Sequence, residues 1–168
     1  MAAHEIAVDV VETRHRNRGV GRAWLILGLS LAFHVADEAA TGFLAVYNPT
    51  VEAIREKLPW LPLPVFRFET WITGLIMAIV ALFLLSPFVF RGARWTRPAA
   101  YGLLIFMLAN ALGHAAGTVF GRTAESVRFP RPMPGFYSSP LLAAASIYLL
   151  YRLRSSGSTG AQRRLPRS

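Results

Sequence analysis

The sequence predicts an all-α membrane protein built as a bundle of four transmembrane helices. Of its 168 residues, 54% are hydrophobic and 16% are charged, and the mean hydropathy is +0.39. Ordinary soluble domains are less apolar and carry more charge. The apolar residues also gather into long runs, and a run of about 20 residues can cross a bilayer as a helix. We therefore expect one compact transmembrane domain.

Prolines mark the ends of the predicted helices. The first helix ends ahead of Pro49, because proline disfavours helical geometry in the residue before it. Pro87 kinks or ends the second helix, and Pro98 occupies the first turn of the third, where proline is tolerated. The fourth helix is the shortest. The four helices are predicted at about residues 22–46, 69–90, 98–119 and 138–153.

Polar segments flank this transmembrane domain on both sides. Residues 1–21 are predicted to form a polar cytoplasmic tail, and its acidic residues Glu5, Asp9 and Glu12 argue against a cleavable signal. Residues 154–168 are rich in Ser, Gly and Arg and are predicted to form a basic, disordered tail. With four spans, the two tails and the second connection hold most of the 18 Lys and Arg residues. The positive-inside rule then places both termini in the cytoplasm.

The charge balance suggests a different class of protein at first sight. A net charge of +9 and an isoelectric point near 11.2 would indicate a nucleic-acid partner for a soluble protein. Here the basic residues lie between the apolar runs, where membrane topology requires them, so we expect membrane lipids and no nucleic acid as partners. The chain has no cysteine, which excludes disulfides, thiolate metal sites and a cysteine nucleophile.

The most unusual stretch is a polar cluster inside the first predicted helix, formed by His34, Asp37 and Glu38. At about 100° per residue, positions i, i+3 and i+4 share one helix face. An ionisable side chain in hydrocarbon costs about 2.5–3.5 kcal/mol or more, so it is kept only when it is paired, bound to metal or facing water. Three such groups on one face predict a partner elsewhere in the chain.

The third predicted helix supplies this partner. Asn110 and His114 are four residues apart and share a helix face. The first and third helices ascend from the same side, so both polar patches lie roughly 18–24 Å along their helices. Glu69 opens the second helix from the opposite side and is predicted to lie just above them. Polar groups of three helices should therefore converge in the outer half of the bilayer.

Two histidines with two or three carboxylates suit a divalent metal, either zinc or iron or manganese. The expected ligands are His34, Asp37, Glu38 and His114, with Asn110 in support. As an enzyme, the protein would be a metal-dependent membrane hydrolase or oxidase acting on a lipid or another amphiphile. In the hydrolytic version, Glu38 or Glu69 would serve as the general base for a metal-activated water.

The same polar network has other uses, which the sequence leaves open. Contacts between histidine, carboxylate and amide groups can hold helices together without any ligand. They can also carry protons or form a polar pocket. The alternatives to an enzyme are therefore a non-catalytic binder of a lipid or small ligand, a component of proton-coupled transport, and a structural subunit. For Glu69, favourable placement at a helix N-terminus is an alternative to ligation.

The stretch His34-Val35-Ala36-Asp37-Glu38, followed by Gly42-Phe43, resembles the motif of the HXXEE family of small bacterial membrane proteins. Asn110-x-x-x-His114 and Pro134-Gly135-Phe136 are similar to further recurring elements of that family. The resemblance implies a helical membrane domain over about residues 22–153 in the bacterial cytoplasmic membrane, and it implies no particular reaction. Asp37 departs from the family motif, which has Glu there; the charge is kept but the reach is shorter by one methylene.

Overall fold

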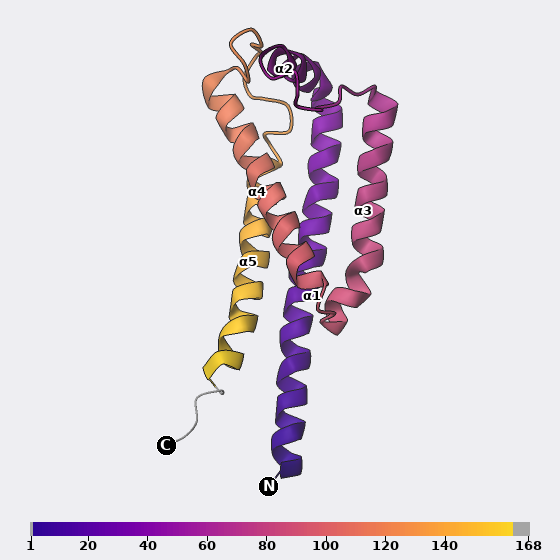
Figure 1. Cartoon of the computed structure of the whole chain (residues 1–168), viewed down its shortest axis with the longest axis vertical. Helices are drawn as coiled ribbons and strands as arrows, with labels where there is room; N and C mark the ends of the chain where they lie inside the picture. Colours follow the sequence, from indigo (N-terminus) through magenta and orange to yellow (C-terminus); the bar gives the residue numbers. More distant parts are fainter. Residues whose placement is uncertain (1, 163–168) are drawn as a thin grey trace.

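The computed structural model describes the backbone of residues 2–162 and the side chains of residues 11–155. Every secondary-structure element found among the described residues is an α-helix, which confirms the predicted all-α class. The five helices are α1 (Ala2–Thr41), α2 (Leu44–Lys57), α3 (Phe68–Arg91), α4 (Thr96–Phe120) and α5 (Ser139–Gln162) (Figure 1).

Four of the helices run lengthwise, and α2 lies across one end of them (Figure 1). α1 packs against α3 on one side and against α5 on the other, and α5 packs in turn against α4. The two middle helices are therefore α1 and α5, with α3 and α4 outside them. Both ends of the described chain lie at the end of the bundle opposite α2.

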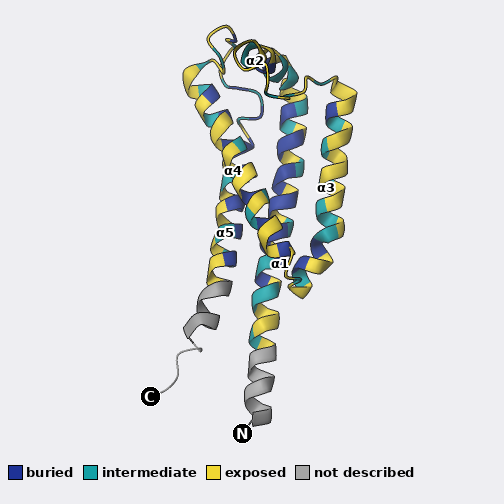
Figure 2. Ribbon diagram, viewed as in Figure 1, coloured by how far each residue is buried: buried dark blue, intermediate teal, exposed yellow. Residues whose placement is uncertain are grey.

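Three helices are long and apolar enough to cross a membrane, namely the part Val11–Thr41 of α1, all of α3 and all of α4. Their outer surfaces are apolar as well. Ile76, Met77 and Leu84 of α3 and Phe106 of α4 are all exposed (Figure 2). Exposed apolar surface of this extent marks contact with a membrane or with another protein, in agreement with the predicted membrane class.

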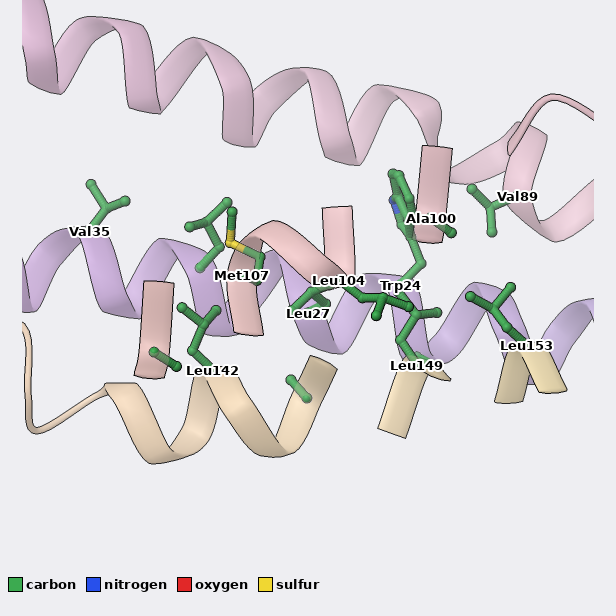
Figure 3. Packing of buried hydrophobic residues seen from close by; sticks show 14 residues of the cluster. Trp24, Leu27, Val35, Val89, Ala100, Leu104, Met107, Leu142, Leu149 and Leu153 are labelled. Atoms are coloured by element: carbon green, nitrogen blue, oxygen red, sulfur yellow. The ribbon is translucent and has the colours of Figure 1, made fainter. Parts of the chain in front are cut away.

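The core follows stripes in which buried residues recur at steps of three and four along three helices. This spacing is typical of helices that bury one face in a bundle. The stripes comprise Trp24, Leu27 and Leu31 of α1, Ala100, Leu104, Met107 and Ala111 of α4, and Leu142, Ala145, Leu149 and Leu153 of α5 (Figure 3). One step further toward α2, each stripe reaches a buried polar residue: His34, His114 or Ser138. The apolar core therefore ends in a polar layer.

The connection between α1 and α2 differs from the prediction. α1 ends at Thr41 and not near residue 46, because Gly42 adopts a left-handed conformation (φ 77°) that turns the chain. Pro49, expected to end the first helix, lies inside α2. Buried Val46 and Val51 hold α2 against the end of the bundle.

The two ends of the chain also differ from the prediction. α1 begins at Ala2, so most of the segment predicted as a polar tail continues the first membrane helix. The acidic and basic residues of this segment include the i, i+4 pair Glu12 and Arg16, a spacing that supports helix. α5 extends to Gln162, beyond the predicted end near residue 153. Residues 163–168 of the predicted C-terminal tail lie outside the described residues.

Candidate metal centre

Three buried side chains from α1 and α4 meet in the polar layer: His34, Glu38 and His114. Each offers one ligand atom, and these atoms lie within 4.8 Å of one another. The Glu38 Oε1 atom is 3.0 Å from His114 Nε2 and 3.4 Å from His34 Nε2. The three residues are 5% exposed or less. The predicted convergence of the first and third membrane helices is therefore confirmed for these three residues.

The register between α1 and α4 explains why these residues meet. Both helices ascend toward α2 (Figure 1), so a pair spaced i, i+4 on one helix lies beside a pair with the same spacing on the other. Glu38 contacts His114, and His34 Nε2 lies 2.9 Å from the side-chain amide nitrogen of Asn110. Asn110 is therefore in contact with the cluster, as its supporting role requires.

Asp37 does not join this cluster, in contrast to the prediction that it is a metal ligand. Its carboxylate oxygen Oδ2 accepts hydrogen bonds from the backbone N–H of Ser138 at 2.9 Å and from its hydroxyl at 2.7 Å. The reason is angular: at about 100° per residue, His34 and Glu38 are only about 40° apart, whereas Asp37 is about 100° from Glu38. Asp37 therefore faces the start of α5 and not α4.

Ser138 links Asp37 to the cluster and determines which nitrogen of His34 carries the proton. The Ser138 hydroxyl lies 2.7 Å from His34 Nδ1. The hydroxyl has a single proton, which it donates to the acceptor-only carboxylate of Asp37, so His34 Nδ1–H donates to the hydroxyl. The other nitrogen, Nε2, is then an acceptor: it accepts the side-chain N–H of Asn110 at 2.9 Å and lies 3.4 Å from Glu38 Oε1. Histidines that ligate metals are commonly oriented by such a hydrogen bond on their second nitrogen.

Replacing Ser138 by alanine is expected to weaken metal binding about 10- to 100-fold, the usual cost of removing a group that orients a metal ligand. The metal would still bind, because all three ligand side chains remain. Competition with a chromophoric chelator measures the change in affinity. Ser146→Ala is the matched control, because Ser146 is a buried serine of α5 whose hydroxyl bonds only to Leu142 O in its own helix. Equal affinities of the two variants would contradict the role of Ser138.

Gly135, in the connection between α4 and α5, packs directly against the cluster. A Cβ atom at this position would lie 2.7 Å from His114 Cε1 and 2.8 Å from Glu38 Cγ. Its φ of 81° is also a conformation that only glycine adopts readily. The Gly135 N–H donates to Thr41 Oγ1 at 3.0 Å, and its carbonyl accepts the hydroxyl of Ser139 at 2.7 Å. Main chain thus covers the cluster at van der Waals distance.

Aromatic rings cover another side of the cluster. The rings of His34 and His114 meet edge to face with centroids 4.8 Å apart. Phe43, in the turn that follows α1, lies 5.5 Å from the His114 ring and 6.0 Å from the buried ring of Trp71 on α3. The polar groups are therefore enclosed by apolar surface, which strengthens electrostatic interactions among them.

Two observations show that the donor set fits a cation. With His34 Nδ1 as a donor, Nε2 carries no proton; it accepts the neutral Asn110 amide at 2.9 Å and lies 3.4 Å from the Glu38 carboxylate. A cation bound between Nε2 and the carboxylate would take the place of this amide hydrogen bond and offset the negative charge of Glu38. In addition, His114 Nδ1 is buried with no hydrogen-bond partner among the described residues, and such an orphaned atom costs about 1–3 kcal/mol. Two imidazoles and one carboxylate are also the donor types that zinc and iron prefer.

Glu69 does not lie near the cluster. It is 76% exposed in the first turn of α3, and its nearest charged partner is Arg67, at 3.8 Å. The prediction that it lies just above the polar groups is therefore not met. Its position agrees instead with the alternative to ligation, in which an acidic side chain is favoured at a helix N-terminus. The reason is that α3 packs on α1 at the edge of the bundle, away from the face of α1 that meets α4 and α5.

Sequence reasoning did not assign a role to Ser138, Gly135 or Thr41, although all three support the site. Ser138 is a serine at a helix start, and Gly135 and Thr41 belong to turns, so their residue types are explained without a site. One signal was available: Ser138 continues the buried stripe of α5 at a spacing of four from Leu142. This stripe ends in a polar residue, as do those of α1 and α4.

The chain was also compared with known proteins. No protein-family model matches it, and neither a curated protein nor a solved structure matches it significantly. The function is therefore argued from the site alone.

Proposed function

We propose that this protein is an integral membrane protein that binds one divalent metal ion inside its helical bundle. The observation that carries the proposal is the buried set of His34, Glu38 and His114, whose ligand atoms lie within 4.8 Å of one another. Ionisable groups at membrane depth are expensive and are retained for a function. Zinc and iron or manganese are the candidates, because the ligands are imidazole and carboxylate.

The proposed topology has four spans, α1, α3, α4 and α5, with both termini in the cytoplasm of a bacterial cell. Three of these helices meet the length and apolarity that a span requires. We add α5 because it packs against both α1 and α4 and buries Leu142, Leu149 and Leu153 there. The end of the bundle that holds both termini also carries most of the arginines, as the positive-inside rule expects for the cytoplasmic side.

A set of two histidines and one carboxylate leaves coordination positions open, which is typical of catalytic metal sites and not of closed structural ones. When bound, such a metal supplies either a nucleophilic water near neutral pH or an oxidising centre. Glu38 is the carboxylate in contact with both histidines, so we assign the role of general base to it and no longer to Glu69. A metal-dependent hydrolase or oxidase acting on a lipid or amphiphile is the enzyme that this arrangement favours.

We also propose membership of the HXXEE family, which rests on the motif itself. The geometry supports it by explaining the departure at position 37. Asp37 contacts Ser138 and not the metal ligands, so this position orients a ligand and tolerates a change of reach better than a ligand position does.

The test is a titration of the metal-free, detergent-purified protein with Co²⁺, whose visible absorption reports coordination by protein groups. The expected result is saturation at one equivalent and loss of the absorption when Zn²⁺ is added. Glu69→Gln is expected to titrate as the wild type does, because Glu69 is remote from the cluster. A change of the spectrum with azide would indicate an open position, whereas an unchanged spectrum would favour the non-catalytic alternative. A protein that develops no cobalt absorption would overturn the proposal.

A further inference from the structure

A cavity lies at the end of the bundle opposite α2, where both termini lie (Figure 1). Its volume is about 320 Å³. Its walls come from the part of α1 around Asn17 and Val20, from the turn between α3 and α4, and from the end of the buried stripe of α5. Pockets that bind small molecules have volumes of about 300–1,000 Å³. The cavity is therefore large enough for a small polar group, and the metal centre makes no use of it.

The polar groups of this cavity are hydrogen-bond donors. Arg94 and Arg97 line it from the turn that leads into α4, and both are exposed. Arg97 is fixed in place, because its guanidinium donates to the carbonyl of Leu153 at 2.8 Å. Arg94 makes no hydrogen bond or ion pair with the described part of the chain. A guanidinium with free donors, held beside a second one, is suited to a phosphate or a carboxylate.

Asn17 of α1 adds an amide to these two cations. Its side chain presses against the turn, since a Cβ atom on Gly92 would lie only 2.4 Å from Asn17 Nδ2. Among the described residues the amide has no hydrogen-bond partner, so it too can donate into the cavity. The remaining wall is apolar and includes buried Val89, apart from Thr96, whose hydroxyl donates to the carbonyl of Ala93 at 2.6 Å. The cavity thus combines positive charge with an apolar side.

The surroundings place this cavity at the level of lipid headgroups. Trp95 and Phe88 are exposed at the same turn, and their rings lie 5.8 Å apart. Exposed tryptophan is enriched where a membrane meets water. Further exposed arginines surround this end of the bundle: Arg18, Arg22, Arg91 and Arg154. The acidic residues in the first part of α1, which are Glu5, Asp9 and Glu12, lie further out along that helix.

We propose that the cavity binds the phosphate group of an anionic phospholipid from the leaflet on the side of the termini. Arg94 and Arg97 would contact the phosphate oxygens, Asn17 would donate an amide hydrogen bond, and the apolar wall would contact the glycerol end of the lipid. Basic pockets between membrane helices on the cytoplasmic side are known to hold such headgroups. The inference rests on the proposed insertion into a membrane and is independent of the metal centre.

Native mass spectrometry of the full chain in detergent tests this inference, with phosphatidylglycerol and phosphatidylcholine offered at equal concentrations. The wild type is expected to retain phosphatidylglycerol in preference to phosphatidylcholine. Arg94→Gln is expected to weaken phosphatidylglycerol binding about tenfold, as the loss of one charge-assisted hydrogen bond predicts. Arg122→Gln is the matched control, because Arg122 is an exposed arginine that directly follows the end of α4. This end of α4 lies at the opposite end of the bundle (Figure 1).

Equal losses in Arg94→Gln and Arg122→Gln would overturn the site, since the lipid would then respond only to overall charge. Equal retention of the two lipids by the wild type would also overturn it. A third arm adds inorganic phosphate: binding of free phosphate at the cavity without a preference for the anionic lipid would overturn the lipid assignment. The metal content of Arg94→Gln is expected to match that of the wild type, which separates a failure here from a failure of the metal proposal.

Discussion

Replacing His114 by alanine is expected to abolish stoichiometric metal binding. The histidine supplies one of the three proposed ligands, so the loss of affinity should exceed the factor of about 10 to 100 that accompanies the loss of an orienting group. The substitution also leaves Glu38 without its 3.0 Å partner. A buried polar group that loses its hydrogen-bond partner costs about 1–3 kcal/mol, and more when it is charged, so a lower stability is expected as well.

A second variant separates loss of the ligand from loss of the fold. In His114→Gln, the side-chain amide can still donate to the Glu38 carboxylate, but an amide is a poor ligand for zinc or iron. This variant should therefore keep the fold and lose the metal. His15→Ala is the control, because His15 is an exposed histidine of α1 outside the bundle core. Metal analysis and thermal unfolding of the three variants check the prediction, and a His114→Gln protein with full metal content would refute the role of His114.

Replacing Gly135 by alanine is expected to disrupt both the site and the stability of the protein. The added methyl group would meet His114 Cε1 at 2.7 Å and Glu38 Cγ at 2.8 Å, and overpacking of this kind costs about 1–3 kcal/mol. The left-handed backbone at this position adds about 1–2 kcal/mol for any residue with a Cβ atom. Because both contacted residues are expected metal ligands, metal affinity should fall together with the unfolding temperature.

Gly113→Ala provides the matched control for this prediction. Gly113 directly precedes His114 in α4, yet a Cβ atom there would meet nothing within 4 Å. Alanine is the better helix former by about 0.5–1 kcal/mol, so this variant should be as stable as the wild type or slightly more stable, with unchanged metal binding. If Gly135→Ala behaved in the same way as Gly113→Ala, this result would contradict the close packing of Gly135 against His114 and Glu38.

The pairing of α1 with α4 could be predicted because it depends on periodicity and depth alone. His34 and Glu38 are four residues apart, as are Asn110 and His114. Both pairs lie at a similar distance along the apolar helices predicted from about residues 22 and 98, which run in the same direction, and the two pairs meet in the structure. Two pairs with the same i, i+4 spacing at the same depth predict a contact between their helices, even when the path of the loops is unknown. The same reasoning predicts the buried stripes, since they follow the helical repeat.

The roles of Asp37 and Glu69 could not be predicted in the same way, because they depend on which helix lies beside which face of α1. The sequence shows that Asp37 is near His34 on the helix surface, but not that the start of α5 lies there to receive it. Likewise, Glu69 has the right depth, but α3 packs at the edge of the bundle, so depth alone does not bring it to the site.

Turns account for the remaining differences. The end of α1 depends on a single residue, Gly42, whose left-handed backbone ends the helix at Thr41, five residues before the predicted end near residue 46. Proline was the stronger signal in the sequence, but Pro49 is accommodated inside α2. Gly135 and Ser138 lie in a connection whose path is fixed by contacts with α1, such as that of Gly135 N–H with Thr41 Oγ1. Such contacts are non-local and leave no periodic pattern.

The central claim is that the buried set of His34, Glu38 and His114 binds a metal ion. The most direct test is the metal content of the detergent-purified wild type, measured by mass spectrometry as isolated and again after chelation and incubation with zinc, iron or manganese. The account predicts one equivalent of a single metal per chain, lost on chelation and restored by incubation. Protein that remains metal-free after incubation with all three ions would contradict it, and the cluster would then be a hydrogen-bonded or proton-carrying network.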